Sequence, residues 1–410
     1  MLKNWIATEE HSDEVQDVSL MEVPSESLES DLVEVTGLDK DVESLVADGE
    51  ELEHDQDQVE ALADNAEASL EEDGMDETAA RATEIAAEAF CGKWGVHRKK
   101  VGLESFGTSD GRRQATQIAV ESLKDAAVNM WETFVKWIKE LVAKAKEQLL
   151  KLTNAGKKIK SRAEKLEARL DKGLGELDKK EVEGSFLQSL TINDQVDYSG
   201  CLEFADKNAA SVDKIGQAIV SSISETGKIT RDGNYTSETG QSRELIGAEF
   251  GKQAKKKLTA PQGASDLKTT ALPGNAYLLS YKVEGIQTLK FEVANDKVKD
   301  AKLPTLKLDE CKAGVKSLFT IGEVLETKLK AFRDANEAMG KLADELGKAK
   351  GDLKEADSEK RDGAKKALKV ARANIGNAKA AERAVTTSMK NAGAGIAGYV
   401  AASIAAYKAA

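Results

Sequence analysis

The chain has 410 residues, of which 59 are Lys or Arg and 72 are Asp or Glu, so its net charge is −13. Aromatic residues make up 5% and there are four prolines, a composition typical of helix-rich chains of one to three domains with modest cores. The three cysteines, Cys91, Cys201 and Cys311, are odd in number and far apart, which argues against a disulfide framework. We expect neither a secretory signal nor a conventional membrane-spanning helix, because no apolar run is long enough.

The net charge conceals two opposed parts. Residues 1–104, which we call the acidic segment, contain 30 acidic and 7 basic residues, a net charge of −23, whereas residues 105–410 have a net charge of +10. Such asymmetry indicates that the two parts have different roles. We expect the acidic segment to be largely disordered or loosely helical, with helices most plausible at about 49–72 and 75–90. It is either a permanent solvated tail or a segment that is removed after assembly.

Residues 105–182 are predicted to form a long amphipathic basic helix. Residues 107–111 are a turn and helix-start signal, and the apolar residues that follow recur at steps of three and four. Gly156 is expected to interrupt this helix, which would then resume to about residue 174. Residues 144–172 carry a net charge of +6, so the helix could lie in a membrane interface, but packing against a partner helix is the favoured interpretation.

Residues 183–304 are predicted to form a small α+β module inserted between two helical arms. Apolar residues alternate at 277–283 and again at 289–293 on either side of Glu284 and Gly285, which predicts a β-hairpin. Short helices are expected at about 209–224 and 242–257, with loops at 227–240 and 261–275.

Residues 305–410 are predicted to form a helical hairpin and an Ala/Gly-rich tail. A coiled-coil-like seam is indicated by five apolar residues spaced seven apart, although Gly322 and Asn336 should weaken it; the five are Leu318, Leu325, Phe332, Met339 and Leu346. The second arm is expected at about 364–389 and a turn-rich segment at 391–407. The predicted fold class is therefore mainly α, with long helices and a helical hairpin around a small α+β module and a disordered acidic N-terminal segment.

No catalytic, cofactor or metal site is indicated. Residues 393–398 match G-x-G-x-x-G, but they follow no predicted strand and begin no βαβ unit. Cys91 and His97 are only two potential metal ligands, and no nucleophile accompanies His97. We therefore expect no enzyme activity, no cofactor and no small-molecule substrate.

The basic helices are the remaining chemical feature. They could bind a polyanion such as DNA without sequence preference, and the acidic segment would mask that surface until it is removed. The alternative is an ordinary solvated lysine face. The candidate polyanion-binding residues are Lys144, Lys146, Lys151, Lys157, Lys158, Lys160, Arg162, Lys365, Lys366, Lys369 and Arg372.

The junction between the two charged parts resembles a proteolytic maturation site. Gly102, Leu103, Glu104 and Ser105 are similar to the site in internal head proteins of giant, contractile-tailed bacteriophages, whose prohead protease cuts after a Glu with a small residue two places earlier. Other tripeptides fit the same rule, among them those at residues 27–29, 69–71, 86–88, 119–121, 242–244 and 247–249. Glu104 is distinguished by its position at the charge reversal, just before a helix start.

The resemblance implies a virion structural protein that lies inside the capsid. It would be made with a propeptide, cut after Glu104 in the assembling head, and packaged or even ejected with DNA. Its partners would be the prohead protease, other head proteins and non-specific DNA after processing, and it would pass through the host cytoplasm during assembly. The alternatives are a cytoplasmic coiled-coil interaction protein with a permanent acidic tail, and a membrane-active helical protein.

Overall fold

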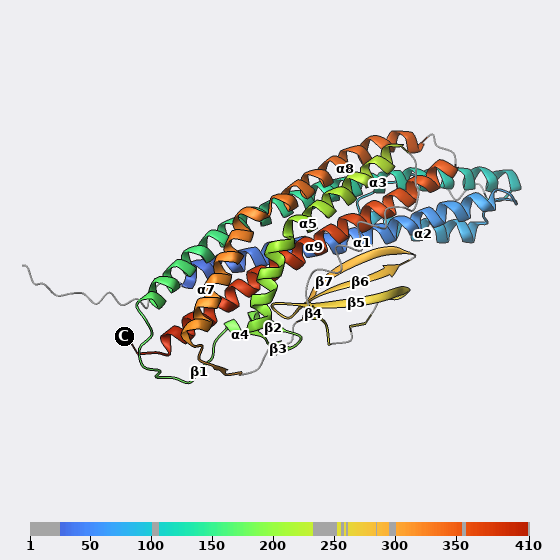
Figure 1. Cartoon of the computed structure of the whole chain (residues 1–410). Coiled ribbons are helices and arrows are strands. Elements are labelled where there is room, and N and C mark those ends of the chain that lie inside the picture. Colours follow the sequence, from blue (N-terminus) through green and yellow to red (C-terminus); the bar gives the residue numbers. More distant parts are fainter. Residues whose placement is uncertain are drawn as a thin grey trace, which may run out of the picture.

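The structure is a computed structural model that describes residues 25–100, 106–232, 252–255, 258–259, 261–283, 285–294, 301–354 and 358–408. Long helices lie side by side in an elongated bundle, and one small antiparallel sheet packs against its flank (Figure 1). The predicted fold class, mainly α with long helices and a small α+β part, is confirmed.

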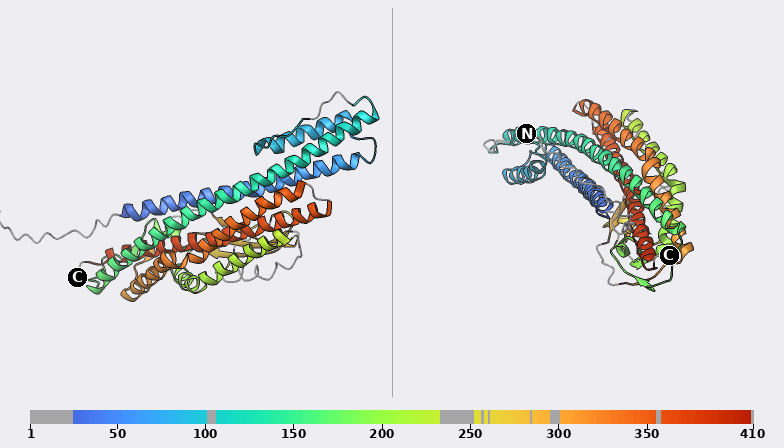
Figure 2. Two further views of the ribbon diagram at one scale, coloured as in Figure 1. Left: turned by 90° about the horizontal axis from the view of Figure 1, so that it is seen from above. Right: turned by 90° about the vertical axis from the view of Figure 1, so that its left-hand side faces the viewer.

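Five long helices and two shorter ones, α2 and α7, make up most of the bundle in the described part of the chain. In chain order they are α1 (Ser25–Ser69), α2 (Glu77–Lys93), α3 (Ser109–Asp171), α5 (Tyr198–Asp232), α7 (Leu308–Glu323), α8 (Lys330–Lys354) and α9 (Ser358–Ala405). A π-helical turn, Val324–Lys328, joins α7 to α8, and the single-turn helix α4 is Phe186–Ser189. Viewed from above, α1 runs along α3 for much of its length, with α9 beside both (Figure 2).

The acidic segment contains more packed structure than expected. Its helices α1 and α2 bury apolar side chains in the same core as α3 and α9, including Val42, Leu52 and Ala87. This segment packs because α1 carries a periodic apolar stripe. The many carboxylates around the stripe make it hard to recognise in the sequence.

Helix α3 begins where the sequence predicts and runs without interruption past Gly156. The Thr108 side chain caps its start, where its Oγ1 accepts a hydrogen bond from the Gly111 N–H at 3.1 Å. Gly156 does not break the helix because it lies at a close helix crossing: a Cβ there would come within 2.8 Å of the Glu326 nitrogen and 2.9 Å of the Gly322 carbonyl oxygen. The prediction of a break was therefore wrong, since this glycine serves packing.

The predicted β-hairpin is present, and the sheet around it is larger than expected. Strands β6 (Ala276–Val283) and β7 (Ile286–Val293) pair in antiparallel register, and the sheet order is β4-β5-β6-β7. Strand β5 (Ala264–Leu272) occupies a stretch that was predicted as loop. Strand β4 (Lys252–Gln253) stands where a helix over 242–257 was expected, and residues 242–251 lie outside the described residues.

A tight turn joins β5 to β6, with Gly274 and Asn275 at φ values of 82° and 54°. Asn275 is buried and donates to the Asp194 carboxylate at 2.9 Å. Two-residue strand pairs accompany the sheet: β1 (Glu181–Val182) with β8 (Leu303–Pro304), and β2 (Thr191–Ile192) with β3 (Gln195–Val196).

The region 183–304 is not a separate insertion between helical arms. Helix α5 spans 35 residues, far more than the predicted short helix, and packs lengthwise on α8 and α9. The sheet is tied to α9 by Asn377, which accepts a hydrogen bond from the Leu289 N–H at 2.6 Å and donates to the Gln287 carbonyl at 2.9 Å. Because β7 is an edge strand, this side chain satisfies backbone groups that would otherwise be unpaired.

The C-terminal region also departs from prediction. All five residues of the predicted seam in α7–α8 are 0% exposed, and Asn336, expected to weaken it, accepts a hydrogen bond from Lys379. The Ala/Gly-rich tail is not turn-rich but continues α9 to Ala405. Its glycines admit close neighbours, since a Cβ on Gly395 would meet Leu190 at 2.8 Å and one on Gly398 would meet Phe186 at 2.6 Å.

The crossing at Gly156 gives a direct test of the packing. Gly156→Ala should lower the free energy of unfolding by about 1–3 kcal/mol, because the added methyl group meets backbone atoms that cannot rotate away. Gly340→Ala, in α8 with open space around its Cα, should be neutral or stabilising by about 0.5–1 kcal/mol. Urea denaturation of the two variants measures both effects, and equal shifts would contradict the assigned crossing.

Candidate functional site

The site of interest is the interface between α1 and the rest of the bundle, which we call the α1 groove. Its walls are α3, α9 and strand β7. It joins the acidic segment to the basic part of the chain, so it brings together the two opposed charges found in the sequence.

An apolar seam runs along α1 into this groove. Two series with seven-residue spacing, offset by three, account for it, and most of their members are buried. Leu45 is half-buried, and Gly49 and Gln56 are the two members without an apolar side chain. This alternation of three and four is the heptad pattern of packed helices. The two series are Val35, Val42, Gly49, Gln56 and Ala63, and Leu38, Leu45, Leu52, Val59 and Ala66.

Gly49 is in the seam because Trp137 of α3 packs directly on it. A Cβ on Gly49 would lie 2.3 Å from a carbon of the Trp137 ring, and the indole nitrogen donates a hydrogen bond to the Leu45 carbonyl. The same ring stacks on Phe134 with a centroid separation of 5.1 Å. The absence of a side chain at Gly49 thus lets an aromatic residue reach the backbone of α1.

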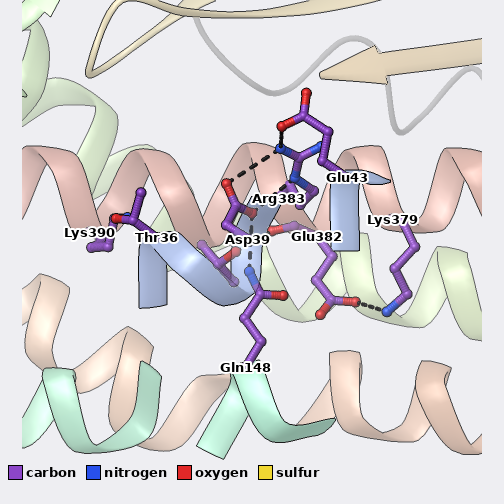
Figure 3. Close-up of polar contacts among 9 residues, drawn as sticks. Thr36, Asp39, Glu43, Gln148, Lys379, Glu382, Arg383 and Lys390 are labelled. Carbon is purple, nitrogen blue, oxygen red and sulfur yellow. Dashed lines mark hydrogen bonds and ion pairs between the residues drawn. The ribbon is translucent and has the colours of Figure 1, made fainter. Parts of the chain in front are cut away.

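A buried ion pair lies at the centre of the groove (Figure 3). The Arg383 guanidinium of α9 donates to the two carboxylate oxygens of Asp39 at 2.9 and 3.4 Å, and to Glu43 at 3.0 Å. Gln148 of α3 donates to Asp39 at 3.1 Å, so this carboxylate joins three helices. The side chains of Arg383 and Asp39 are only 7% and 9% exposed. The guanidinium also lies 5.0 Å from the centre of the Phe291 ring on β7.

A second pair lies one turn away on α9. Lys379 donates to Glu382 at 2.7 Å, and both side chains are almost completely buried. Burial raises the pKa of the Glu382 carboxyl and lowers the pKa of the Lys379 ammonium, while the attraction between them opposes both shifts. Helix α9 therefore supplies its own counter-ion for Lys379, but not for Arg383.

Two further cations on the same face of α9 bond to polar side chains of α1. Lys390 donates to the Thr36 hydroxyl at 2.7 Å, and Arg372 donates to the Gln56 amide oxygen at 2.6 Å. Burial lowers the pKa of the Lys390 ammonium. Arg372 also lies 4.5 Å from the centre of the Phe134 ring. The four cations Arg372, Lys379, Arg383 and Lys390, which we call the α9 cation row, are spaced 7, 4 and 7 apart and so share one helical face.

A cavity of about 490 Å³ opens beside the row, between α1, α9 and strands β6 and β7. Carboxylates of α1 and cations of α9 and β7 line it together with apolar side chains. The charged lining residues are Glu43, Glu50, Glu53, Lys290, Lys369, Arg372, Lys379 and Arg383. The charges of the two parts of the chain thus face each other here as well.

The predicted polyanion-binding residues do not form one exposed surface. On α3, Lys146 and Lys157 are exposed, whereas Lys144 pairs with Asp41 of α1 at 3.4 Å and Lys160 pairs with Glu326 at 2.9 Å. Lys151, Lys158 and Arg162 are half-buried on the same helix, as is Lys369 on α9.

In the intact chain, Arg372 is buried against α1, where it bonds to Gln56. The side chains of Lys365 and Lys366 lie outside the described residues.

The predicted cleavage residues Gly102, Leu103, Glu104 and Ser105 also lie outside the described residues. Their flanks are anchored: the Lys99 carbonyl accepts a hydrogen bond from Ser122 of α3 at 2.7 Å, and Lys100 pairs with Glu88 at 3.0 Å. Helix α2 ends at Lys93 and α3 begins at Ser109, so the cleavage residues lie between these two helices along the chain.

Other chemistry is limited in the part of the chain that the structure describes. No group of three or more His, Cys, Asp or Glu residues is arranged there to hold a metal ion, and none of the described helices is long and apolar enough to cross a membrane. The three cysteines are buried and none of them forms a disulfide, and burial raises the pKa of the Cys311 thiol to about 11. This high pKa keeps the Cys311 thiol protonated and unreactive.

The sequence analysis missed Asp39, Gln148 and Arg383 as site residues. Two signals could have found the groove. One is the pair of series with seven-residue spacing in α1. The other is the set of four cations on one face of the alanine-rich helix α9, a face where apolar neighbours make burial of the charges more plausible than exposure to solvent.

Comparison with known proteins identifies a family. The model of the phiKZ-like phage internal head proteins matches residues 38–402, which is most of the chain, so the chain belongs to this family. Its members are structural proteins of the virion interior. No curated protein and no solved structure gives a significant match.

The central ion pair makes the first prediction for this site. Asp39→Ala should weaken docking of α1 by about 3 kcal/mol, because it removes two hydrogen bonds from a buried guanidinium. Hydrogen exchange of α1 amides should accelerate by about 100-fold. Combining Asp39→Leu with Arg383→Met should restore most of the protection.

A matched control is Glu77→Gln in α2, whose exposed pair with Arg81 should contribute less than about 0.5 kcal/mol. Equal exchange rates in Asp39→Ala and the parent chain would contradict the assigned role of the pair.

Proposed function

We propose that this internal head protein enters the assembling phage head with its acidic segment attached, and that a prohead protease then cuts after Glu104. The mature chain 105–410 lies with the packaged DNA and makes contacts with other head proteins, without catalysis of its own. The observation that carries this proposal is the coincidence of three features at residues 102–105: the charge reversal, a sequence that fits the family's cleavage rule, and a position between two helices.

The surroundings of the other matching tripeptides support the choice of Glu104. Residues 27–29, 86–88 and 119–121 lie within α1, α2 and α3, where the helical backbone cannot extend into a protease cleft. Residues 69–71 lie at the end of α1, where Glu71 is exposed in a turn, so a further cut within the acidic segment is compatible with the fold. The two matches at 242–249 lie outside the described residues.

A change of charge gives removal of the acidic segment a function. The intact chain has a net charge of −13, and removal of a segment with −23 leaves +10. An acidic chain is repelled by DNA, whereas a basic one attracts it by releasing counterions. Exposed lysines of α3, Lys146 and Lys157, support such a contact in the mature chain.

Mass spectrometry of purified particles tests the cleavage. We expect a mature N-terminus at Ser105, and Glu104→Gln should leave the intact chain in the particles. Glu121→Gln, which alters the match inside α3, should not change processing. An intact parent chain in particles, or a different mature N-terminus, would instead favour a permanent acidic segment.

Salt dependence tests the contact with DNA. The mature chain 105–410, separated from its acidic segment, should bind duplex DNA at least about 10-fold more tightly than the intact chain at low salt, with an affinity that falls steeply as salt rises. Lys146→Glu combined with Lys157→Glu should reduce the log–log salt slope by about 2. The control Lys207→Glu changes an exposed lysine of α5, away from the basic region of α3, and should have less effect. A flat salt response would count against the proposal.

A further inference from the structure

We infer that cutting the chain after Glu104 does not release the acidic segment: α1 and α2 remain bound in the α1 groove as a separate, non-covalently held chain. The timing of the cut rests on the proposed function, but the strength of the interface does not. Cleavage and exposure of the basic surface would then be two separate events.

The apolar seam is the first reason. It runs from Val35 to Ala66, a helical length of roughly 46 Å, and its ends and centre are buried against α3 and its neighbours. Interfaces built from a continuous core of this kind resemble those of obligate complexes, which do not depend on a covalent link.

The charges of α9 are the second reason. Arg383 is bonded to Asp39 and Glu43, and Lys390 to Thr36, all on α1. Departure of α1 would leave these cations against an apolar wall that includes Phe291. The bonds from these cations to α1 thus add charge complementarity to the apolar seam, and both favour retention of the acidic segment in the groove.

Anchors at the other end of the segment are the third reason. The Met75 N–H donates to the Thr116 hydroxyl of α3 at 2.8 Å, and Lys124 pairs with Glu67 at 2.7 Å. The Trp94 indole donates to Asp55 at 2.8 Å, which fixes α2 to α1. The described part of the segment is therefore held by contacts along α1 and at its junction with α2, in addition to its covalent link to the rest of the chain.

The family match agrees with an integral role. It begins at residue 38, inside α1, and so includes most of the seam, most of α1 and the whole of α2. These helices belong to the common sequence of the family and are not an appended tail.

An engineered cut tests the inference without the phage protease. The recognition sequence of an unrelated site-specific protease replaces residues 101–105, the purified full-length protein is cut, and completeness is verified on a denaturing gel. Native mass spectrometry and size-exclusion chromatography should then give a 1:1 complex of the two chains at micromolar and at about 100-fold lower concentration. This complex should bind DNA no more tightly than the intact chain.

Separate elution of the acidic segment at micromolar concentration, or precipitation of the remaining chain after cutting, would overturn the inference. Neither result bears on where the phage protease cuts, which the mature N-terminus in particles decides independently.

Two glycines of α1 provide matched variants. Gly49→Leu places a side chain against the Trp137 ring and should increase dissociation of the cut segment at least about 10-fold, whereas Gly37→Leu faces open space and should leave the complex intact. Equal dissociation in the two variants would show that the seam does not hold the segment, and would also overturn the inference.

Discussion

The buried pair of Asp39 and Arg383 is the constraint on which the arrangement of the two parts of the chain depends. A guanidinium keeps its charge in any environment, so Arg383 on a buried face of α9 must have a carboxylate partner. Asp39 provides it from a helix more than 300 residues away in the chain, and Gln148 of α3 completes the contact. Because the apolar seam of α1 repeats every seven residues, it could slide by one heptad, whereas the pair fits in one register only.

Small residues make this arrangement possible. Helix α9 is rich in alanine and glycine and is buried on most of its surface, which lets α3, α5, α7 and the sheet approach it closely. Gly156 and Gly49 play the same part on α3 and α1, where they admit a neighbouring backbone and an aromatic ring. Glycines, which weaken an isolated helix, therefore stabilise a crowded bundle by allowing close packing.

The acidic segment is accordingly both a carrier of charge and a structural part of the bundle. Its carboxylates face the cations of α9 and α3, and its apolar seam completes their core. In the intact chain, the cationic face of α9 is therefore covered by the acidic segment.

Sequence alone was sufficient for the features that depend on neighbours in the chain. The start of α3 at a turn, the β6–β7 hairpin, the apolar face of α3 and the seam of α7–α8 all follow from local periodicity and turn residues. Local signals failed where a residue had a distant partner. From the sequence, Gly156 predicts a helix break, whereas in the structure it packs against Gly322 within a continuous helix. The Ala/Gly-rich tail likewise predicts turns, whereas in the structure it is part of α9, which is buried among other helices.

The site residues were missed for the same reason, because their partners are distant in the sequence. The sequence determined that an acidic part and a basic part meet near Glu104, since charge is a property of composition. Only the tertiary structure decided that they dock on each other, that Arg372 points inward, and that Arg383 bonds to Asp39. Burial and pairing depend on which surfaces meet in space, and residues 344 positions apart leave no mark of that meeting in a local pattern.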